Sequence, residues 1–165
     1  MTQVGITGTD VTINGRPTYT GRTYRGQRIE GLLFNVRAVQ ATFDDSNPVT
    51  RKFWAYPDTG VWDAQRNVDE FCAALPAWRD HGVLAFTANI QGGGARYFPD
   101  VYDVYDNNGF TPAGDLKPDY ARRLLQVIGR ADDLGMVVIL GIFYWKHVGK
   151  FVGDAAIRRA AESAV

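Results

Sequence analysis

An uninterrupted apolar run occupies residues 135–145: Gly135-Met136-Val137-Val138-Ile139-Leu140-Gly141-Ile142-Phe143-Tyr144-Trp145. The run is continuous rather than alternating, and a strand that is apolar on both faces is typical of a buried parallel strand. Parallel neighbours need crossover connections, so the amphipathic stretch before it, residues 118–134, is predicted to be a crossover helix. The same helix-then-strand pattern occurs once earlier, over residues 68–89. The chain is therefore predicted to contain a parallel α/β sheet.

Length and charge limit the class of protein. The 165 residues, 45% of them hydrophobic, suit a single domain over residues 1–165. The 18 basic and 18 acidic side chains cancel, so neither nucleic acid nor a membrane surface is an expected partner. The first residues lack the charged start and apolar core of a secretory signal. We therefore expect a cytoplasmic protein or one whose leader has been removed. The single cysteine, Cys72, is expected to be a reduced thiol in the core.

Local signals place the other elements. Asn14-Gly15 between β-rich flanks predicts a hairpin over residues 9–20. Strands are predicted at 29–39 and 83–89, each turning polar at its carboxyl end. Asn67, with Glu70 three residues later, predicts the start of the first long helix. Apolar residues at helical spacing define the buried faces of the two crossover helices: Val68, Phe71, Cys72, Leu75 and Trp78 in the first, and Tyr120, Leu124, Val127, Ile128, Ala131 and Leu134 in the second.

Loop lengths narrow the architecture. Long segments, 40–63 and 90–117, follow the first two strands, whereas the returns from helix to strand are short. Functional loops at the carboxyl ends of the strands are typical of a (β/α)₈ barrel. A doubly wound sheet is the alternative, but its nucleotide-binding form needs a glycine-rich turn that leads directly into a helix, and Gly92-Gly93-Gly94 lies more than twenty residues before one. The fold class is therefore predicted to be α/β, a partial (β/α)₈ TIM barrel of about three βα units over 29–165 after an N-terminal β-hairpin.

Common catalytic groupings are absent from the sequence. Ser46 and Ser163 are not in a nucleophile elbow, and His81 and His147 are predicted at opposite ends of their βα units, where they could not share a metal. No cofactor and no metal site are expected.

Aromatic residues are concentrated in the two long loops, which hold five each, and near the end of the third strand. An aromatic ring suits the C–H face of a sugar, while amide and guanidinium groups bond its hydroxyls. The alternative is that the rings only pin the loops to the domain. This packing role is expected for Phe43, Phe98 and Phe110, and for Trp54, Tyr144 and Trp145 both interpretations stay open. The candidate substrate-binding residues are Asn35, Arg37, Trp54, Asn89, Gln91, Tyr144, Trp145 and His147.

Five stretches in order resemble a known family: residues 11–17 (Val-Thr-Ile-Asn-Gly-Arg-Pro), 33–40, 56–60 (Tyr-Pro-Asp-Thr-Gly), 89–93 and 135–141. Together they are similar to the opening of a cellulase-like glycoside hydrolase of clan A. The resemblance implies a barrel that cleaves β-glycosidic bonds with retention, using one glutamate after the fourth strand and another after the seventh.

The resemblance reaches only the first three of the family's eight βα units. The expectation is therefore an N-terminal fragment of a glycoside hydrolase, with a carbohydrate substrate and no catalytic residue in this chain. By itself the fragment is expected to be inactive and prone to self-association. The first alternative is a non-catalytic carbohydrate-binding or assembly protein built from a partial barrel. The second is a different barrel enzyme whose chemistry lies in the missing strands.

Overall fold

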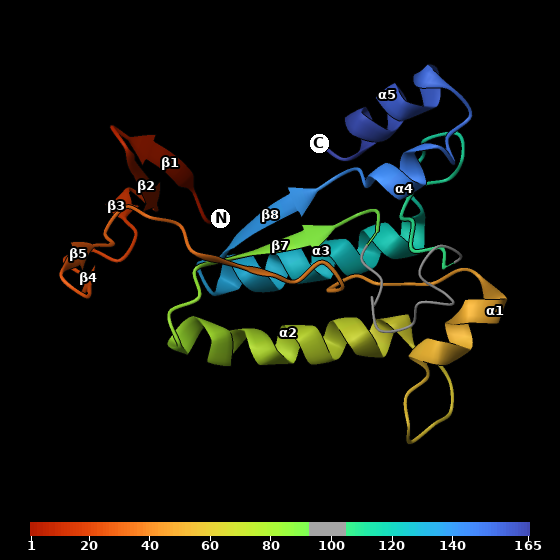
Figure 1. Ribbon diagram of the computed structural model, residues 1–165, viewed down its shortest axis with the longest axis horizontal. Helices are drawn as coiled ribbons and strands as arrows, with labels where there is room; N and C mark the ends of the chain where they lie inside the picture. Colours follow the sequence, from red (N-terminus) through yellow and green to blue (C-terminus); the bar gives the residue numbers. More distant parts are fainter. Residues whose placement is uncertain (93–104) are drawn as a thin grey trace.

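The computed structural model describes residues 1–92 and 105–165 of the chain (Figure 1). Strands β1 (Val4–Thr7), β2 (Asp10–Ile13) and β3 (Arg16–Pro17) form a small antiparallel sheet near the N-terminus. Asn14 and Gly15 have φ of 51° and 75°, the two positive values that a tight hairpin turn requires, and they join Ile13 to its partner Arg16. The predicted Asn-Gly hairpin is confirmed. Strands β4 (Thr23–Tyr24) and β5 (Gln27–Arg28) form a second antiparallel pair.

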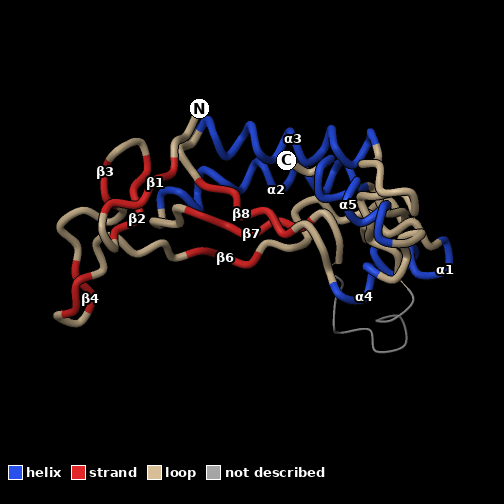
Figure 2. Tube along the Cα trace, turned by 90° about the horizontal axis from the view of Figure 1, so that it is seen from above, coloured by secondary structure: helices blue, strands red, loops and turns tan. Residues whose placement is uncertain are grey.

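A three-stranded parallel sheet forms the centre of the molecule. It contains β6 (Asn35–Arg37), β7 (Ala85–Asn89) and β8 (Val137–Gly141), in that order. Helices α2 (Ala64–Asp80) and α3 (Pro118–Asp133) lie together on one side of it (Figure 2). Between sheet and helices lies a core in which Val68, Leu75, Phe86 and Val127 are all fully buried. Cys72 packs in the same core, and burial raises the pKa of its thiol.

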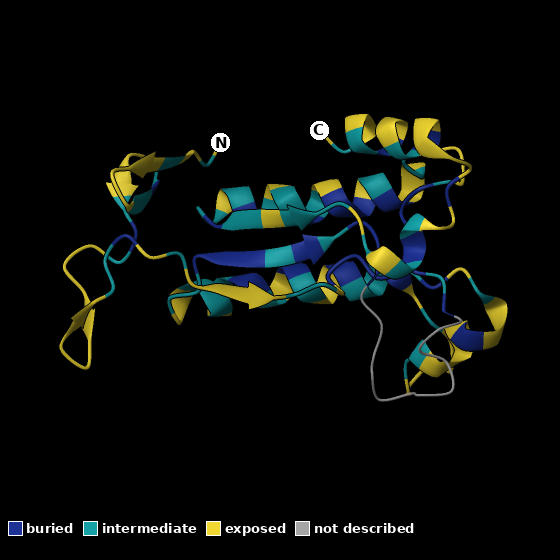
Figure 3. Cartoon of the chain, turned by 45° about the horizontal axis from the view of Figure 1, so that its top comes forward, coloured by how far each residue is buried: buried dark blue, intermediate teal, exposed yellow. Residues whose placement is uncertain are grey.

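Short helices and loops gather beyond the carboxyl ends of the parallel strands. They include α1 (Pro48–Arg51), the 3₁₀ helix η1 (Lys52–Trp54), α4 (Trp145–Val148) and α5 (Asp154–Ser163). A second apolar cluster, around Ile90, Phe110 and Tyr120, packs α5 against the first half of α3. Figure 3 shows this end of the molecule as a mixture of buried and exposed segments.

Helix α2 begins earlier than predicted. Asp63 is its N-cap, and the carboxylate of Asp63 accepts hydrogen bonds from the backbone N–H groups of Gln65 and Arg66, both at 2.9 Å. The prediction that Asn67 and Glu70 form the cap is wrong. The side-chain amide of Asn67 instead donates to backbone carbonyls of the loop after β6, and Glu70 pairs with Arg66. Asp63 is as good a cap as asparagine and precedes three residues with no helix breaker, so the helix extends back to it.

The prediction of a partial (β/α)₈ barrel is also wrong. In the described residues the fold is mixed α/β, with five α-helices and three small sheets, two antiparallel and one parallel. A barrel requires every strand to be paired along both edges. Within the same residues β6 and β8 each pair only with β7, and the first parallel strand shrinks from the predicted 29–39 to 35–37. Leu32 and Phe34, which lie within the predicted strand, are 46% and 51% exposed.

Candidate functional site

The loops that follow the three parallel strands meet at the carboxyl ends of the strands, as the loop lengths predicted. An isolated bridge between Asp45 and Asn107 joins the loop after β6 to the loop after β7, and a second bridge, between Gln91 and Asn108, closes the loop after β7 on itself. All four of these polar residues are buried. Burying polar groups is unfavourable unless they are hydrogen-bonded, so their partners show how this region is built.

Asp45 holds the first loop in place. The Asp45 carboxylate is fully buried and accepts from the Trp54 indole N–H at 2.7 Å, from the Thr50 hydroxyl, and from the backbone N–H groups of Asn47 and Asp106 at 3.0 and 2.8 Å. Sequence reasoning did not single out Asp45, whose only signal is the turn-rich stretch 44–48.

The half-buried ring of Trp54 also lies edge-on to Phe43, with ring centroids 4.8 Å apart. Phe43 and Phe110 are buried at 2% and 1% exposure, as expected for rings that pin loops. Phe98, assigned the same role, lies outside the described residues. Trp54 therefore serves to anchor the loop in this structure.

Gln91 and Asn107 join the loops after β7 and β8 to the loop after β6. The Gln91 side chain accepts from the backbone N–H of Tyr144 at 3.1 Å and donates to Asn108 at 3.2 Å. Asn107 accepts from the backbone N–H of Asp44 at 3.0 Å and donates to the Gly92 carbonyl. Gln91 is fully buried, and both ends of its amide are used in this way. It is thus placed at the predicted site but beneath the surface.

His147 lies under the same loops at 3% exposure. Its ring packs between those of Tyr105 and Tyr144, with centroids 5.7 and 5.8 Å away. The Nδ1 atom has no hydrogen-bond partner among the described residues. Burial lowers the pKa of His147 to about 4, the Lys150 ammonium adds to the shift, and the Asp106 carboxylate opposes it. The imidazole is consequently neutral at neutral pH.

Among the described residues, Trp145 is the most exposed aromatic residue of this end. It opens α4, and its side chain is 74% exposed. The half-buried ring of Tyr144 lies beside it, with centroids 6.1 Å apart and planes at 52°, and the Lys146 ammonium lies 5.2 Å from the Trp145 ring centroid. Figure 2 shows α4 on the side of the sheet away from α2 and α3. This arrangement presents a flat apolar ring with a polar margin to solvent.

Three predicted polar residues lie on the same helix-free side. The register places Arg37, Thr87 and Ile139 in one row across the sheet, on the opposite face from the core residue Phe86. Asn35 and Asn89 share the face of Arg37 by the two-residue period. Asn35 accepts from the Thr87 hydroxyl at 3.3 Å and is exposed, as is Arg37, whereas Asn89 is half-buried.

The eight predicted residues thus fall into three groups: Asn35, Arg37 and Asn89 on the open sheet face, Tyr144 and Trp145 beside it, and Trp54, Gln91 and His147 in the supporting layer.

Two carboxylates at this end, those of Asp44 and Asp106, are each held by a cation. Asp44 contacts the buried Arg123 at 2.8 Å and Arg51 at 3.6 Å. Asp106 pairs with Lys150 at 2.5 Å and accepts from the Ser46 hydroxyl. Burial raises the pKa of Asp106, but these two partners outweigh it and the net pKa is lowered. A general acid needs a raised pKa, so the lowered pKa of Asp106 does not suit it to that role.

The described residues contain no group of three or more His, Cys, Asp or Glu side chains that could hold a metal ion. No helix among them is long and apolar enough to cross a membrane. The chain matches no protein-family model, and no curated protein or solved structure is significantly similar to it.

Proposed function

We propose that this chain binds β-linked oligosaccharides at the exposed ring of Trp145, as the substrate-binding part of a glycoside hydrolase. The observation that carries the proposal is the 74% exposure of Trp145 beside an open sheet face with Asn35, Arg37 and Asn89. The exposed indole offers a flat apolar face with a polar margin, which suits the C–H face of a sugar ring. The family resemblance of the five sequence stretches supplies the class of ligand.

The underlying layer would keep this surface rigid. Gln91 holds the backbone of Tyr144, and the rings of Tyr144 and His147 pack together beneath the loop. A preorganised ring loses little conformational freedom when a sugar stacks on it, which favours binding. Amide groups of Asn35 and Asn89 and the guanidinium of Arg37 supply donors and acceptors for hydroxyl groups.

A non-catalytic carbohydrate-binding protein is the second candidate. It is favoured by the carboxylates of this end, because Asp44, Asp45 and Asp106 are all occupied by cations or hydrogen-bond donors. Retaining hydrolysis needs two carboxyl groups about 5 Å apart across one bond, one of them a proton donor. In either case we expect the 165-residue protein to bind sugar without hydrolysing it.

Binding is tested by titrating the protein with cellopentaose, xylopentaose and mannopentaose, followed by tryptophan fluorescence and calorimetry. We expect Trp145→Ala to weaken binding of the preferred sugar roughly tenfold, since ring stacking contributes about 1 kcal/mol beyond the buried area. Tyr24→Ala is the matched control, an exposed aromatic residue of β4 at the far end of the molecule. Equal affinity in the Trp145 variant and the wild type would contradict the proposal.

The two candidates are separated by assaying release of reducing sugar from the preferred oligosaccharide. Two carboxylates are changed in turn: Asp44, which contacts Arg123, and Asp58, an exposed carboxylate that pairs with Arg66 at 2.8 Å. Hydrolysis by the purified chain that disappears in Asp44→Asn or Asp58→Asn would reveal an active site in this chain and exclude the non-catalytic candidate. Sugar binding without hydrolysis is the expected result.

A further inference from the structure

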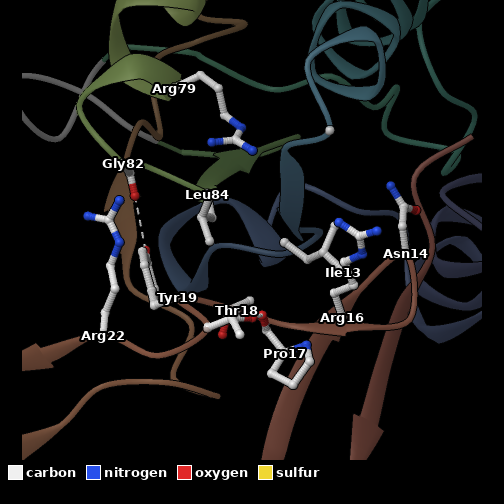
Figure 4. Close-up of a pocket in the computed structure, with 12 residues that line it drawn as sticks. Ile13, Asn14, Arg16, Pro17, Thr18, Tyr19, Arg22, Arg79, Gly82 and Leu84 are labelled. Carbon is white, nitrogen blue, oxygen red and sulfur yellow. Dashed lines mark hydrogen bonds between the residues drawn. The ribbon is translucent and has the colours of Figure 1, made fainter.

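A cavity lies at the opposite end of the molecule, at the amino ends of the parallel strands (Figure 4). Its volume is about 610 Å³. The walls come from the β2–β3 hairpin, the turn that follows it, the end of α2 and the residues that lead into β7 and β8. The lining includes Arg16, Tyr19, Arg22, Arg79 and Gly82.

The lining contains three arginines and no acidic residue. Arg16, Arg22 and Arg79 form no ion pair with any carboxylate in the part of the chain that the structure describes. Arg28, by contrast, lies in the neighbouring β5, and both ends of its guanidinium are bonded to the carboxylate of Asp10, at 3.0 and 2.6 Å. Three positive charges thus face one cavity without a counter-charge from its walls.

Arg79 is held so that part of its guanidinium remains free. Its Nε–H donates to the Leu134 carbonyl at 3.2 Å, which fixes the side chain near the end of α2. Figure 4 shows its terminal nitrogens directed into the cavity, with Arg22 beside Gly82 and Arg16 on the other side. The three guanidinium groups therefore approach the space from different elements. Each offers the planar fork that matches carboxylate and phosphate oxygens.

The wall that carries Tyr19 adopts an unfavourable backbone conformation. Tyr19 has φ of 51°, a left-handed value that bulky side chains rarely adopt. Its hydroxyl donates to the Gly82 carbonyl at 3.1 Å and its ring packs 5.4 Å from that of Phe34, and these contacts hold the turn against the end of α2. Burial raises the pKa of the Tyr19 hydroxyl, and the charge of nearby Arg79 opposes that shift. Strained residues of this kind cluster at ligand sites.

We propose that this cavity binds a small molecule that carries at least two oxyanionic groups, either carboxylates or phosphates. Two groups are needed because the three arginines stand on separate walls, and a single oxyanion could satisfy only part of them. The volume lies within the range of small-molecule sites. A bound polyanion would also remove the mutual repulsion of three like charges in one cavity. The site is independent of the sugar surface at Trp145.

The test is calorimetry on the whole chain with pyrophosphate and with citrate, which separate phosphate from carboxylate ligands. We expect saturable binding of one molecule per chain by at least one of them, with affinity that falls as NaCl is raised because the site is partly open to solvent. Sodium sulfate, which carries one anionic group, should bind at least tenfold more weakly. Absence of saturable binding by both probes would overturn the proposal, as would equal affinity for sulfate.

Variants then locate the site. Arg16→Gln, Arg22→Gln and Arg79→Gln should each weaken binding about tenfold, as expected for losing a hydrogen bond to a charged group. Arg25→Gln is the matched control, since it makes the same charge change in the β4–β5 turn outside the cavity. Arg16 and Arg22 make no side-chain hydrogen bond in the described structure, so these two variants should stay folded even if Arg79→Gln does not. Equal weakening by Arg25→Gln would show that only net charge matters, and would refute the site. Trp145→Ala should leave pyrophosphate and citrate binding unchanged.

Discussion

His147 should make the stability of this protein fall steeply in mild acid. The folded state buries the neutral imidazole between Tyr105 and Tyr144 and lowers its pKa from the ordinary 6.5 to about 4. The unfolded chain therefore takes up a proton at a higher pH than the folded protein does. The stabilisation is fully present above pH 6.5 and is lost as the pH falls from there towards 4.

The size of the effect follows from the two pKa values. One pH unit between them is equivalent to 1.36 kcal/mol, so the loss relative to pH 7.5 is about 2 kcal/mol at pH 5 and about 3 kcal/mol at pH 4. Asp106, whose pKa is lowered by Lys150 and Ser46, protonates in the folded protein only at still lower pH. Between pH 5 and 7.5 we therefore expect His147 to dominate.

The measurement is urea denaturation of the wild type and of His147→Phe at pH 5.0 and 7.5. Phenylalanine keeps an aromatic ring among the neighbouring rings and cannot titrate. We expect the wild type to lose about 2 kcal/mol more than the variant between the two pH values. A His81→Gln background leaves a single imidazole, so its NMR titration can be assigned to His147 and should have a midpoint near 4. The reasoning fails if both proteins show the same pH dependence, or if that imidazole titrates near 6.5.

Three other substitutions test the packing. Asp45→Ala removes the fully buried acceptor of four hydrogen bonds and should lower the free energy of unfolding by about 3 kcal/mol or more, against a smaller loss for Asp45→Asn, both measured in urea. Leu75→Ala removes a fully buried side chain and should lower the free energy of unfolding, measured in urea, by about 3–5 kcal/mol. Leu125→Ala, at a 66% exposed position, should change it by less than about 0.5 kcal/mol. Similar losses in the two variants would mean that Leu75 is not in the core. One edge of β8 pairs with no strand in residues 1–92 and 105–165, and it should drive concentration-dependent self-association that Ile139→Lys reduces in light scattering. A wild type that stays monomeric at high concentration would contradict this.

Local patterns were sufficient to predict several parts of the fold. The Asn14-Gly15 turn forms where the two residues can both adopt positive φ. The helical spacing of apolar residues predicted the buried faces of α2 and α3, as the full burial of Val68, Leu75 and Val127 shows. The continuous apolar run at 135–145 correctly predicted a parallel strand, β8, but its predicted burial is wrong, since Ile139 is 38% exposed and the rest of the strand is half-buried. These features depend on neighbours within a few residues, so the sequence alone could determine them.

Tertiary contacts decided the rest. An apolar run favours a strand but does not determine which elements cover its faces or pair with its edges, so the run at 135–145 was compatible with a barrel that the three separate sheets exclude. Trp54 and Trp145 are both aromatic residues of loops at the same end, yet Trp54 packs on Phe43 and bonds Asp45 while Trp145 remains exposed. Their difference arises because Trp54 lies where the loops after β6 and β7 meet, and Trp145 opens a helix on the uncovered side of the sheet. Which polar and aromatic groups face solvent is a property of how distant loops pack, and no local pattern carries that information.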